Sequence, residues 1–219
     1  MSIKIFFSEI SCESSSTISE LMKLVSHEKK EKLLKFKLDI DRKLSLYSEL
    51  LVRYQACREL NILNKDIVFV KNKNEKPFLL NHSKFHFNIS HTRNAIVVAF
   101  LNSEIGIDIE SIKPLDLKIA KRFFTSSEQD YIISHDNPDY AFYEVWTKKE
   151  AYIKYIGTGL STPLKSFNVM NDKIRSILHT YVTKKYIVST CYKGLSISAP
   201  KITELSEVKL QRLINTMSE

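Results

Sequence analysis

The sequence predicts an α+β fold, because each half of the chain combines helical stretches with short apolar strands. Residues 41–60 (DRKLSLYSELLVRYQACREL) repeat Leu and Tyr at helical spacing, which is typical of a helix that packs one face on a core. Residues 105–110 (IGIDIE) alternate with a period of two, which is typical of a strand. No short-period repeat or linker interrupts the sequence, and we expect a boundary between the halves near residues 101–104.

The first half is predicted to begin with a strand over residues 3–7, followed by two helices. The helix over 26–36 begins at Ser26, a favourable N-cap residue. The apolar stripe of the second helix consists of Leu44, Tyr47, Leu50, Leu51 and Tyr54. The extended segments predicted after it are 66–72, 73–80 (after a turn), 84–90 and 94–101.

The second half is predicted to continue from the strand at 105–110 into three helices. Residues 116–124 are helical in pattern, and 125–133 begin with TSSE, which favours a capping box. A long helix over 140–157 is expected to end at Gly157. Beyond it, β-like runs at 180–192 and 195–199 predict a further sheet.

The composition is that of a globular protein with a real core, since 43% of the residues are hydrophobic and 11% are aromatic. The longest clean apolar run, 95–101, is far shorter than the roughly 20 residues that span a membrane, and MSIKIFFSEI does not resemble a secretory signal. Cys12, Cys57 and Cys191 lack the spacing of metal ligands. We therefore expect free thiols, no membrane contact and a cytoplasmic location.

The net charge of +8 is concentrated in the first half of the chain. Residues 1–101 contain 17 Lys and Arg against 11 Asp and Glu, whereas residues 102–219 contain 16 against 14. Such an excess attracts nucleic acid, an anionic small molecule or an acidic protein, and it also occurs on a merely solvated basic surface.

Two acids on strand 105–110 require an explanation. Asp108 and Glu110 share the face opposite the isoleucines, where adjacent like charges repel each other. A bound cation would relieve this repulsion, and Gly106 on the same face would leave room for a ligand. The alternative is that both acids simply face solvent.

A third acid lies in the predicted helix 140–157. Trp146, Lys149, Glu150 and Lys154 lie at positions i, i+3, i+4 and i+8 of this helix, and we expect them to share one helix face. If this helix packs beside strand 105–110, three carboxylates would surround one point and suit a hard divalent cation such as Mg²⁺. In the alternative, Glu150 only pairs with Lys154 along the helix.

Several residues of the first half suit anion binding. Ser90 and His91 end the strand FHFNISHT, and a hydroxyl beside an imidazole can bind an anion, although the pair is equally compatible with a polar turn. Lys29 and Lys32 are about one helical turn apart and could clamp a phosphate or form a solvated face. Lys76 precedes a rigid proline turn. Because no Gly-rich phosphate loop is present, phosphate binding must depend on side-chain cations and a metal.

These segments, in this order, resemble the 4′-phosphopantetheinyl transferases, specifically the longer Sfp-type (surfactin-synthetase-activating) members. The resemblance runs through SHEKKEKLLKF, SELLVR, EKPFL, FHFNISHT, IGIDIE, AKRFFTSSE and WTKKEAYIKYIGTGLS. GIDIE followed about 40 residues later by WTKKEAYIK is the most specific part of this pattern. It favours the functional alternative at each of the positions above.

The resemblance implies a pseudo-twofold monomer of two similar α+β halves with the site between them. Residues 1–102 would contact coenzyme A, and residues 103–219 would hold the metal and dock a carrier protein, with apolar residues near 112–133 taking part. The implied reaction passes 4′-phosphopantetheine from coenzyme A to a serine of an apo acyl or peptidyl carrier protein, as in nonribosomal peptide or polyketide synthesis. It leaves adenosine 3′,5′-bisphosphate.

The resemblance also implies residue roles. Asp108, Glu110 and Glu150 would bind Mg²⁺, with Mn²⁺ as the alternative, and Lys154 would contact phosphate oxygens. The coenzyme A phosphates would be bound by Lys29, Lys32, Ser90 and His91, with Lys76 near the adenine or the phosphates. The base for the carrier serine would be Glu150 or a water on the metal, with Glu128 a further candidate, and Trp146 would shape the site.

One position departs from the family pattern, because Leu44 stands where family members often carry an arginine. Arg42 or Lys43 could replace it. Two other classes of function fit less well: a non-catalytic module that binds coenzyme A or carrier proteins would not need all the acids, and a nucleic-acid binder would be expected to show a recognisable motif.

Overall fold

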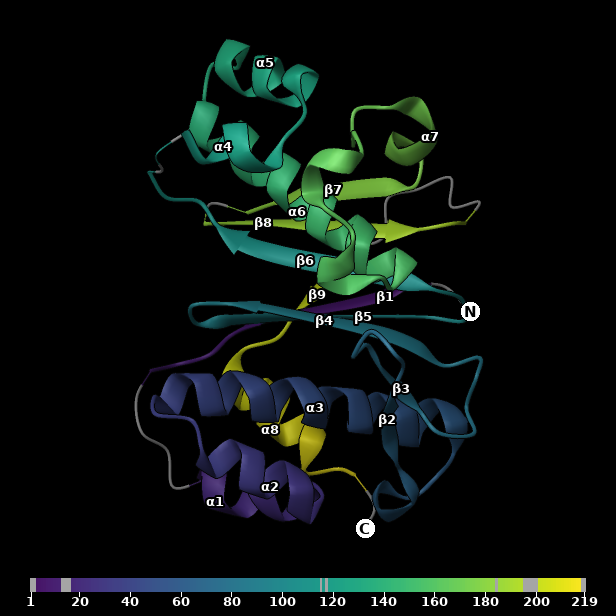
Figure 1. Cartoon of the computed structure of the whole chain (residues 1–219). Coiled ribbons are helices and arrows are strands. Elements are labelled where there is room, and N and C mark those ends of the chain that lie inside the picture. The colour runs from purple at the N-terminus through teal and green to yellow at the C-terminus, as the bar shows by residue number, and fades with distance from the viewer. Residues whose placement is uncertain are drawn as a thin grey trace.

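Two β-sheets lie face to face between outer layers of helices in the computed structural model of the chain (Figure 1). The structure describes residues 3–12, 17–114, 116, 118–183, 185–194 and 201–217. The α+β prediction is therefore confirmed.

The first half contains three helices and five strands within the described residues. They are β1 (Lys4–Glu9), α1 (Thr17–Leu21), α2 (His27–Leu34), α3 (Asp39–Leu60), β2 (Phe69–Lys71), β3 (Pro77–Leu79), β4 (His86–Thr92) and β5 (Ala95–Leu101), with 3₁₀ turns η1 (Met22–Leu24) and η2 (Asn64–Asp66). The predicted cap is present, since the Ser26 hydroxyl accepts a hydrogen bond from the Lys29 amide at 3.2 Å. All five residues of the predicted stripe on α3 are buried.

The second half and the end of the chain contain the remaining elements of the described residues. They are β6 (Ile105–Ser111), α4 (Lys118–Phe123), α5 (Ser126–Ser134), α6 (Pro138–Ile156), η3 (Gly159–Ser161), η4 (Leu164–Ser166), α7 (Asp172–Arg175), β7 (Leu178–Val182), β8 (Tyr186–Tyr192), β9 (Ile202–Glu204) and α8 (Glu207–Ile214). Gly157 ends α6 in the left-handed conformation, as predicted. The run 195–199, predicted to be extended, lies outside the described residues.

The two halves repeat one arrangement, in which a long helix covers the outer face of a sheet. The helix α3 lies below the sheet β4-β5-β1-β9, and α6 lies above the sheet β6-β8-β7 (Figure 1). An apolar cluster fills the space between the sheets and includes Ile5, Val97, Ile105, Ile107 and Ile109. The period of two on β6 thus buries its isoleucines between the sheets and turns its acids toward α6.

Gly106 does not leave room for a ligand, contrary to our prediction. A Cβ atom at this position would lie 2.0 Å from the Ala151 carbonyl oxygen and 2.5 Å from the Tyr155 amide nitrogen, both in the backbone of α6. The glycine instead lets α6 pack closely on β6. This close approach brings the acids of the strand beside those of the helix.

The end of the chain returns to the first half. β9 pairs in parallel with β1, and α8 packs on α3, where Leu210 and Ile214 enter the core and Glu207 forms an ion pair with Lys43 at 2.9 Å. The predicted second half, 103–219, therefore does not stay together in space, because residues 201–217 belong to the fold of the first half.

We found no helix long and apolar enough to cross a membrane among the described residues.

Candidate functional site

A cavity of about 470 Å³ opens where β4, β6 and α6 meet. Its walls are formed by Ile89, Ser90 and His91 of β4, Asp108 and Glu110 of β6, and Trp146, Glu150 and Lys154 of α6. All of these residues except Ile89 are predicted site residues. The structure thus brings together three segments that are separated in sequence by up to about 60 residues.

The local periodicities explain this convergence. Asp108 and Glu110 are two residues apart on a strand, so both side chains leave β6 on the same side. Trp146, Glu150 and Lys154 are spaced by four residues, so each lies one turn beyond the last on the same side of α6. The packing of α6 on β6 then places the two rows opposite each other.

Asp108 is buried and is held by two donors. The Lys154 ammonium lies 2.6 Å from Asp108 Oδ1, and the Ser90 hydroxyl donates to the same oxygen at 2.7 Å. Lys154 also donates to Ser90 Oγ at 2.9 Å, so the three side chains form a closed network. The ion pair of Lys154 is therefore with Asp108, and not with Glu150 as the simpler alternative proposed.

The other two acids experience an environment that opposes negative charge. Burial and the nearby Asp108 carboxylate raise the pKa of Glu110, whose Oε2 accepts a hydrogen bond from Thr92 Oγ1 at 2.9 Å. Burial and Asp108 also raise the pKa of Glu150. A cation at this point would favour the ionised form of both side chains.

The donor set suits a hard divalent cation, although its members are not gathered around one point. No three His, Cys, Asp or Glu side chains in the part of the chain that the structure describes lie close enough together to hold a metal ion. Asp108 Oδ2 is nevertheless buried without a hydrogen-bond partner among the described residues, which is costly unless a ligand satisfies it. Three carboxylates with one unsatisfied oxygen fit Mg²⁺ chemistry.

His91 lies exposed on the cavity wall. The protein atoms around its ring and the Lys154 ammonium lower the pKa of this imidazole. The neutral form therefore predominates at pH 7, and His91 can contribute a hydrogen bond to an anion rather than a full charge.

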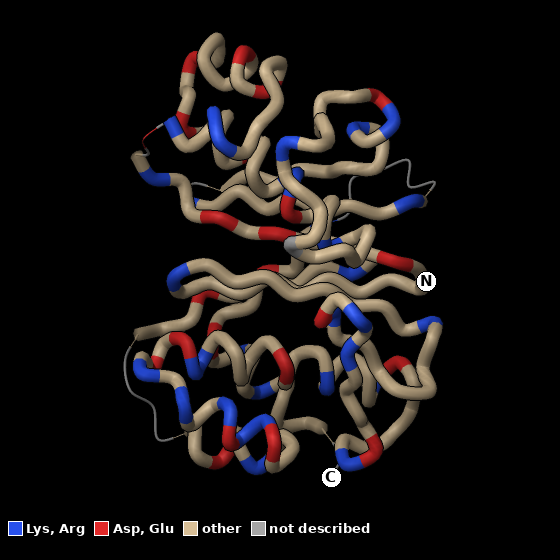
Figure 2. The backbone as a smooth tube through the Cα atoms, in the orientation of Figure 1, with Lys and Arg blue, Asp and Glu red and all other residues tan. Residues whose placement is uncertain are grey.

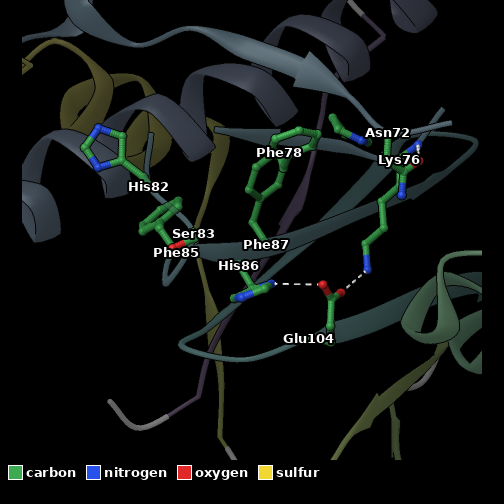
Figure 3. A pocket seen from close by; sticks show the side chains of 10 residues that line it. Asn72, Lys76, Phe78, His82, Ser83, Phe85, His86, Phe87 and Glu104 are labelled. Atoms are coloured by element: carbon green, nitrogen blue, oxygen red, sulfur yellow. Dashed lines mark hydrogen bonds and ion pairs between the residues drawn. The ribbon is translucent and has the colours of Figure 1, made fainter. Parts of the chain in front are cut away.

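A second cavity, of about 270 Å³, contains Lys76 and lies at the other end of β4 (Figure 3). Lys76 Nζ pairs with Glu104 at 2.6 Å, and His86 Nδ1 lies 3.3 Å from the same carboxylate. Aromatic side chains line its wall, among them Phe78 and Phe87. One strand, β4, thus borders both cavities.

Lys29 and Lys32 lie outside the walls of both cavities. Lys29 Nζ donates to Ser45 Oγ at 3.0 Å and lies 3.3 Å from Glu49, which ties α2 to α3. Lys32 is exposed and pairs with Glu28 one turn earlier on α2. Both signs of charge are interspersed along these helices (Figure 2).

Glu128, predicted as an alternative base, does not face the cavity. It is fully buried, completes the capping box of α5 with Thr125, and pairs with the fully buried Lys149 at 2.9 Å. Its second oxygen accepts a hydrogen bond from the Val169 amide at 2.9 Å. Both oxygens are engaged in the core, which gives Glu128 a structural role. Lys149 likewise points into the core and does not share the cavity face of α6, contrary to our prediction.

Neither predicted replacement for the family arginine reaches the cavity. Arg42 donates to the Leu33 and Phe36 carbonyl oxygens and pairs with Asp39, which closes the turn between α2 and α3. Lys43 is buried against Glu207 of α8. Both side chains are committed to the fold.

Two residues outside the predicted site, Asn88 and Thr92, hold the acidic strand. Asn88 Oδ1 accepts a hydrogen bond from the Ile107 amide at 3.0 Å, and Thr92 donates to Glu110. The available signal was the period of two along β4, which places both residues on the same face as Ser90.

Comparison with known families divides the chain into two matches. Residues 104–201 match the 4′-phosphopantetheinyl transferase superfamily, and residues 13–103 match the 4′-phosphopantetheinyl transferase N-terminal family.

Comparison with individual proteins gives the same result. The chain is 35% identical over 196 residues to the 4′-phosphopantetheinyl transferase gsp of Aneurinibacillus migulanus, covering 85% of this chain and 82% of that protein. It is 39% identical over 150 residues to the 4′-phosphopantetheinyl transferase Sfp of Bacillus subtilis, covering 68% and 67%. A mouse L-aminoadipate-semialdehyde dehydrogenase-phosphopantetheinyl transferase is 33% identical over 156 residues, covering 64% and 50%.

Proposed function

The chain belongs to the 4′-phosphopantetheinyl transferase superfamily, and from this membership we propose how its residues transfer 4′-phosphopantetheine to a carrier protein. The chain is an enzyme of the Sfp type, and the family uses coenzyme A and a divalent metal. The acceptor is the serine of an apo acyl or peptidyl carrier protein, and the second product is adenosine 3′,5′-bisphosphate. The convergence of Asp108, Glu110, Glu150 and Lys154 on one cavity carries this proposal.

Asp108, Glu110 and Glu150 would hold the cation, which we propose to be Mg²⁺. When bound, it supplies positive charge to the pyrophosphate of coenzyme A. The support is the unsatisfied Oδ2 of Asp108 and the burial that raises the pKa of Glu110 and Glu150.

Lys154 donates to a phosphate oxygen as a point charge, because its ammonium lies on the cavity wall between Ser90 and Asp108. Ser90 and His91 add hydrogen bonds to the phosphates. Trp146 packs edge-on against Phe123 and forms part of the cavity wall, which shapes the site.

Glu150 accepts the proton of the carrier serine. The serine oxygen attacks the phosphorus next to pantetheine, the bond from that phosphorus to adenosine 3′,5′-bisphosphate breaks, and the proton passes to Glu150. Glu150 lines the same cavity as Lys154, so its ionised carboxylate is available to accept this proton.

The coenzyme lies along β4, with its pyrophosphate at Lys154 and its nucleoside directed toward Lys76. This placement rests on the two cavities at the ends of the strand. Lys29 and Lys32 approach from α2 and bind the outer phosphates after exchanging their present acidic partners for the ligand.

The carrier protein docks on the second half, near residues 112–133, where Ile119 and Ile133 are exposed. We place the enzyme in the cytoplasm, in keeping with its three free cysteines, and expect it to act as a monomer. Carriers of nonribosomal peptide or polyketide synthesis are the proposed substrates.

Intact-mass spectrometry tests the function directly. An apo peptidyl carrier protein incubated with the enzyme, coenzyme A and Mg²⁺ should gain the mass of one phosphopantetheine. The gain should disappear with EDTA and with Asp108→Ala, whereas Asp66→Ala, which removes an exposed acid of η2, should react normally. Replacing Mg²⁺ by Mn²⁺ in the same assay shows which metal is preferred.

If the peptidyl carrier gains no mass, the assay is repeated with an acyl carrier protein, which separates carrier selectivity from inactivity. Failure with both carriers would contradict the proposal and would favour a module that binds coenzyme A without catalysis.

A further inference from the structure

We propose that Thr92 and Asn88 are positioning residues that hold the acidic strand in place for metal binding. They belong to the first half, whereas the acids they hold belong to the second. This inference rests on the proposed function only in taking Asp108 and Glu110 to be metal ligands.

The two strands concerned are neighbours that belong to different sheets. β4 forms one edge of the first sheet and β6 one edge of the second. Asn88, Ser90 and Thr92 pair across β4–β5 with Ala99, Val97 and Ala95, whose side chains enter the apolar cluster between the sheets. These polar residues therefore point from an otherwise apolar face toward β6.

Three hydrogen bonds made by side chains at every second residue of β4 join the two strands. Asn88 Oδ1 accepts a hydrogen bond from the Ile107 amide at 3.0 Å, Ser90 donates to Asp108 at 2.7 Å and Thr92 donates to Glu110 at 2.9 Å. We call these three bonds the β4–β6 clasp. Each step of two residues along β4 matches a step of one or two along β6, so a slip of one residue would break the clasp.

Asn88 acts through the backbone. The Ile107 amide is buried, and without the Asn88 carbonyl it would lack this acceptor. Asn88 therefore fixes how far β6 lies along β4, and this decides whether Ser90 and Thr92 meet the correct acids.

Thr92 forms a direct hydrogen bond with Glu110, one of the proposed metal ligands. An ionised carboxylate only accepts hydrogen bonds, so a hydroxyl donor on Glu110 Oε2 fixes the orientation of the group and leaves Oε1 for the cation. Outer partners of this kind typically change metal affinity by about 10–100-fold when removed.

The test compares Thr92→Val, which keeps the shape and removes the donor, with Thr92→Ser, which keeps the donor. Mn²⁺ binding to the whole protein without coenzyme A is measured by electron paramagnetic resonance. We expect Thr92→Val to weaken Mn²⁺ binding by about 10–100-fold and Thr92→Ser to bind like the wild type. Thermal unfolding identifies any variant that does not fold, and Thr92→Ala replaces Thr92→Val in that case.

A second readout separates positioning from a general loss of structure. Transferase activity of Thr92→Val should need more Mg²⁺ for half-saturation and should recover at high Mg²⁺. Equal Mn²⁺ affinity in Thr92→Val and wild type would overturn the inference, as would equal losses in the Val and Ser variants. The activity of the wild type separates this inference from the proposed function. If the wild type modifies the carrier, the proposed function stands whatever the Thr92 variants show. If the wild type is inactive, the proposed function is contradicted.

Asn88→Leu provides an independent check on the register. We expect a lower melting temperature together with weaker Mn²⁺ binding, because both acids move with the strand. A variant that melts at a lower temperature yet binds Mn²⁺ like the wild type would contradict the assigned role of Asn88.

Discussion

Asp108 and Glu110 show how a basic protein keeps two acids side by side on one strand. Asp108 forms an ion pair with Lys154 and accepts a hydrogen bond from Ser90, whereas Glu110 accepts a hydrogen bond from Thr92. Each acid is therefore provided with its own donor from β4. The repulsion that made this stretch unusual in the sequence is reduced without removing the charges, and one buried oxygen of Asp108 is left unsatisfied.

Lys29 and Lys32 provide a prediction at this scale. Lys29→Glu and Lys32→Glu should each raise the KM for coenzyme A while leaving kcat similar, because they would remove a charged phosphate contact. Such a contact is worth about 1.5–3 kcal/mol, or roughly 10–100-fold in KM. Steady-state kinetics with varied coenzyme A measures the effect.

The matched control is Lys23→Glu, the same charge change on the exposed turn η1. Its KM should stay within about twofold of the wild type. An unchanged KM in both α2 variants would show that these lysines do not contact the coenzyme.

The site residues could be predicted where one local period decided their direction. The period of two on β6 and of four on α6 placed Asp108, Glu110, Glu150 and Lys154 correctly on facing surfaces. Glu128 could not be placed, because its partner Lys149 lies on another helix and only the folded core shows that both are fully buried. Arg42 and Lys43 were uncertain for the same reason.

The packing of α6 on β6 decides whether the acids of the two elements meet. Gly106→Ala would place a methyl group against the Ala151 carbonyl oxygen and the Tyr155 amide, neither of which can move without displacing the helix. We expect a loss of unfolding free energy of at least about 1–3 kcal/mol, as overpacking typically causes. Activity should fall as well, since Glu150 and Lys154 move with α6.

Urea unfolding measures this loss, and Gly194→Ala is its control. Among the described residues, a Cβ atom at position 194 would meet ring atoms of Tyr192, the nearest at 3.3 Å. That variant should unfold within about 0.5 kcal/mol of the wild type. A Gly106→Ala protein with wild-type stability and activity would mean that α6 does not need this close approach.

Element boundaries were predicted well where a pattern was long and less well where it was short. The helix predicted over 41–60 is α3, Asp39–Leu60, and the one predicted over 140–157 is α6, Pro138–Ile156. The strand predicted over 66–72 is shorter in the structure, Phe69–Lys71, because its partner β3 is only three residues long. β9 was missed, since a strand of three residues has almost no periodicity.

The whole molecule is divided in space differently from the way it is divided in sequence. The cavity of the candidate site lies between the halves, and the β4–β6 clasp joins them beside it. The last residues then cross back and complete the first sheet. A division at residue 102 would therefore separate β1 from β9 and α3 from α8, and local patterns could not reveal a pairing across nearly the whole chain.

This return of the chain leads to a prediction about α8. Leu210 is fully buried against the core around α3, whereas Val208, two residues earlier, is 57% exposed. Leu210→Ala should lower the unfolding free energy by about 2–5 kcal/mol, and Val208→Ala should change it by less than about 0.5 kcal/mol. Urea unfolding followed by circular dichroism and by Trp146 fluorescence measures both variants.

If the halves unfold as one unit, the two signals should shift together in Leu210→Ala, although Trp146 lies in the other half. A shift of the circular dichroism alone would show that the halves unfold separately, and an unshifted Leu210→Ala would show that α8 is not needed for stability.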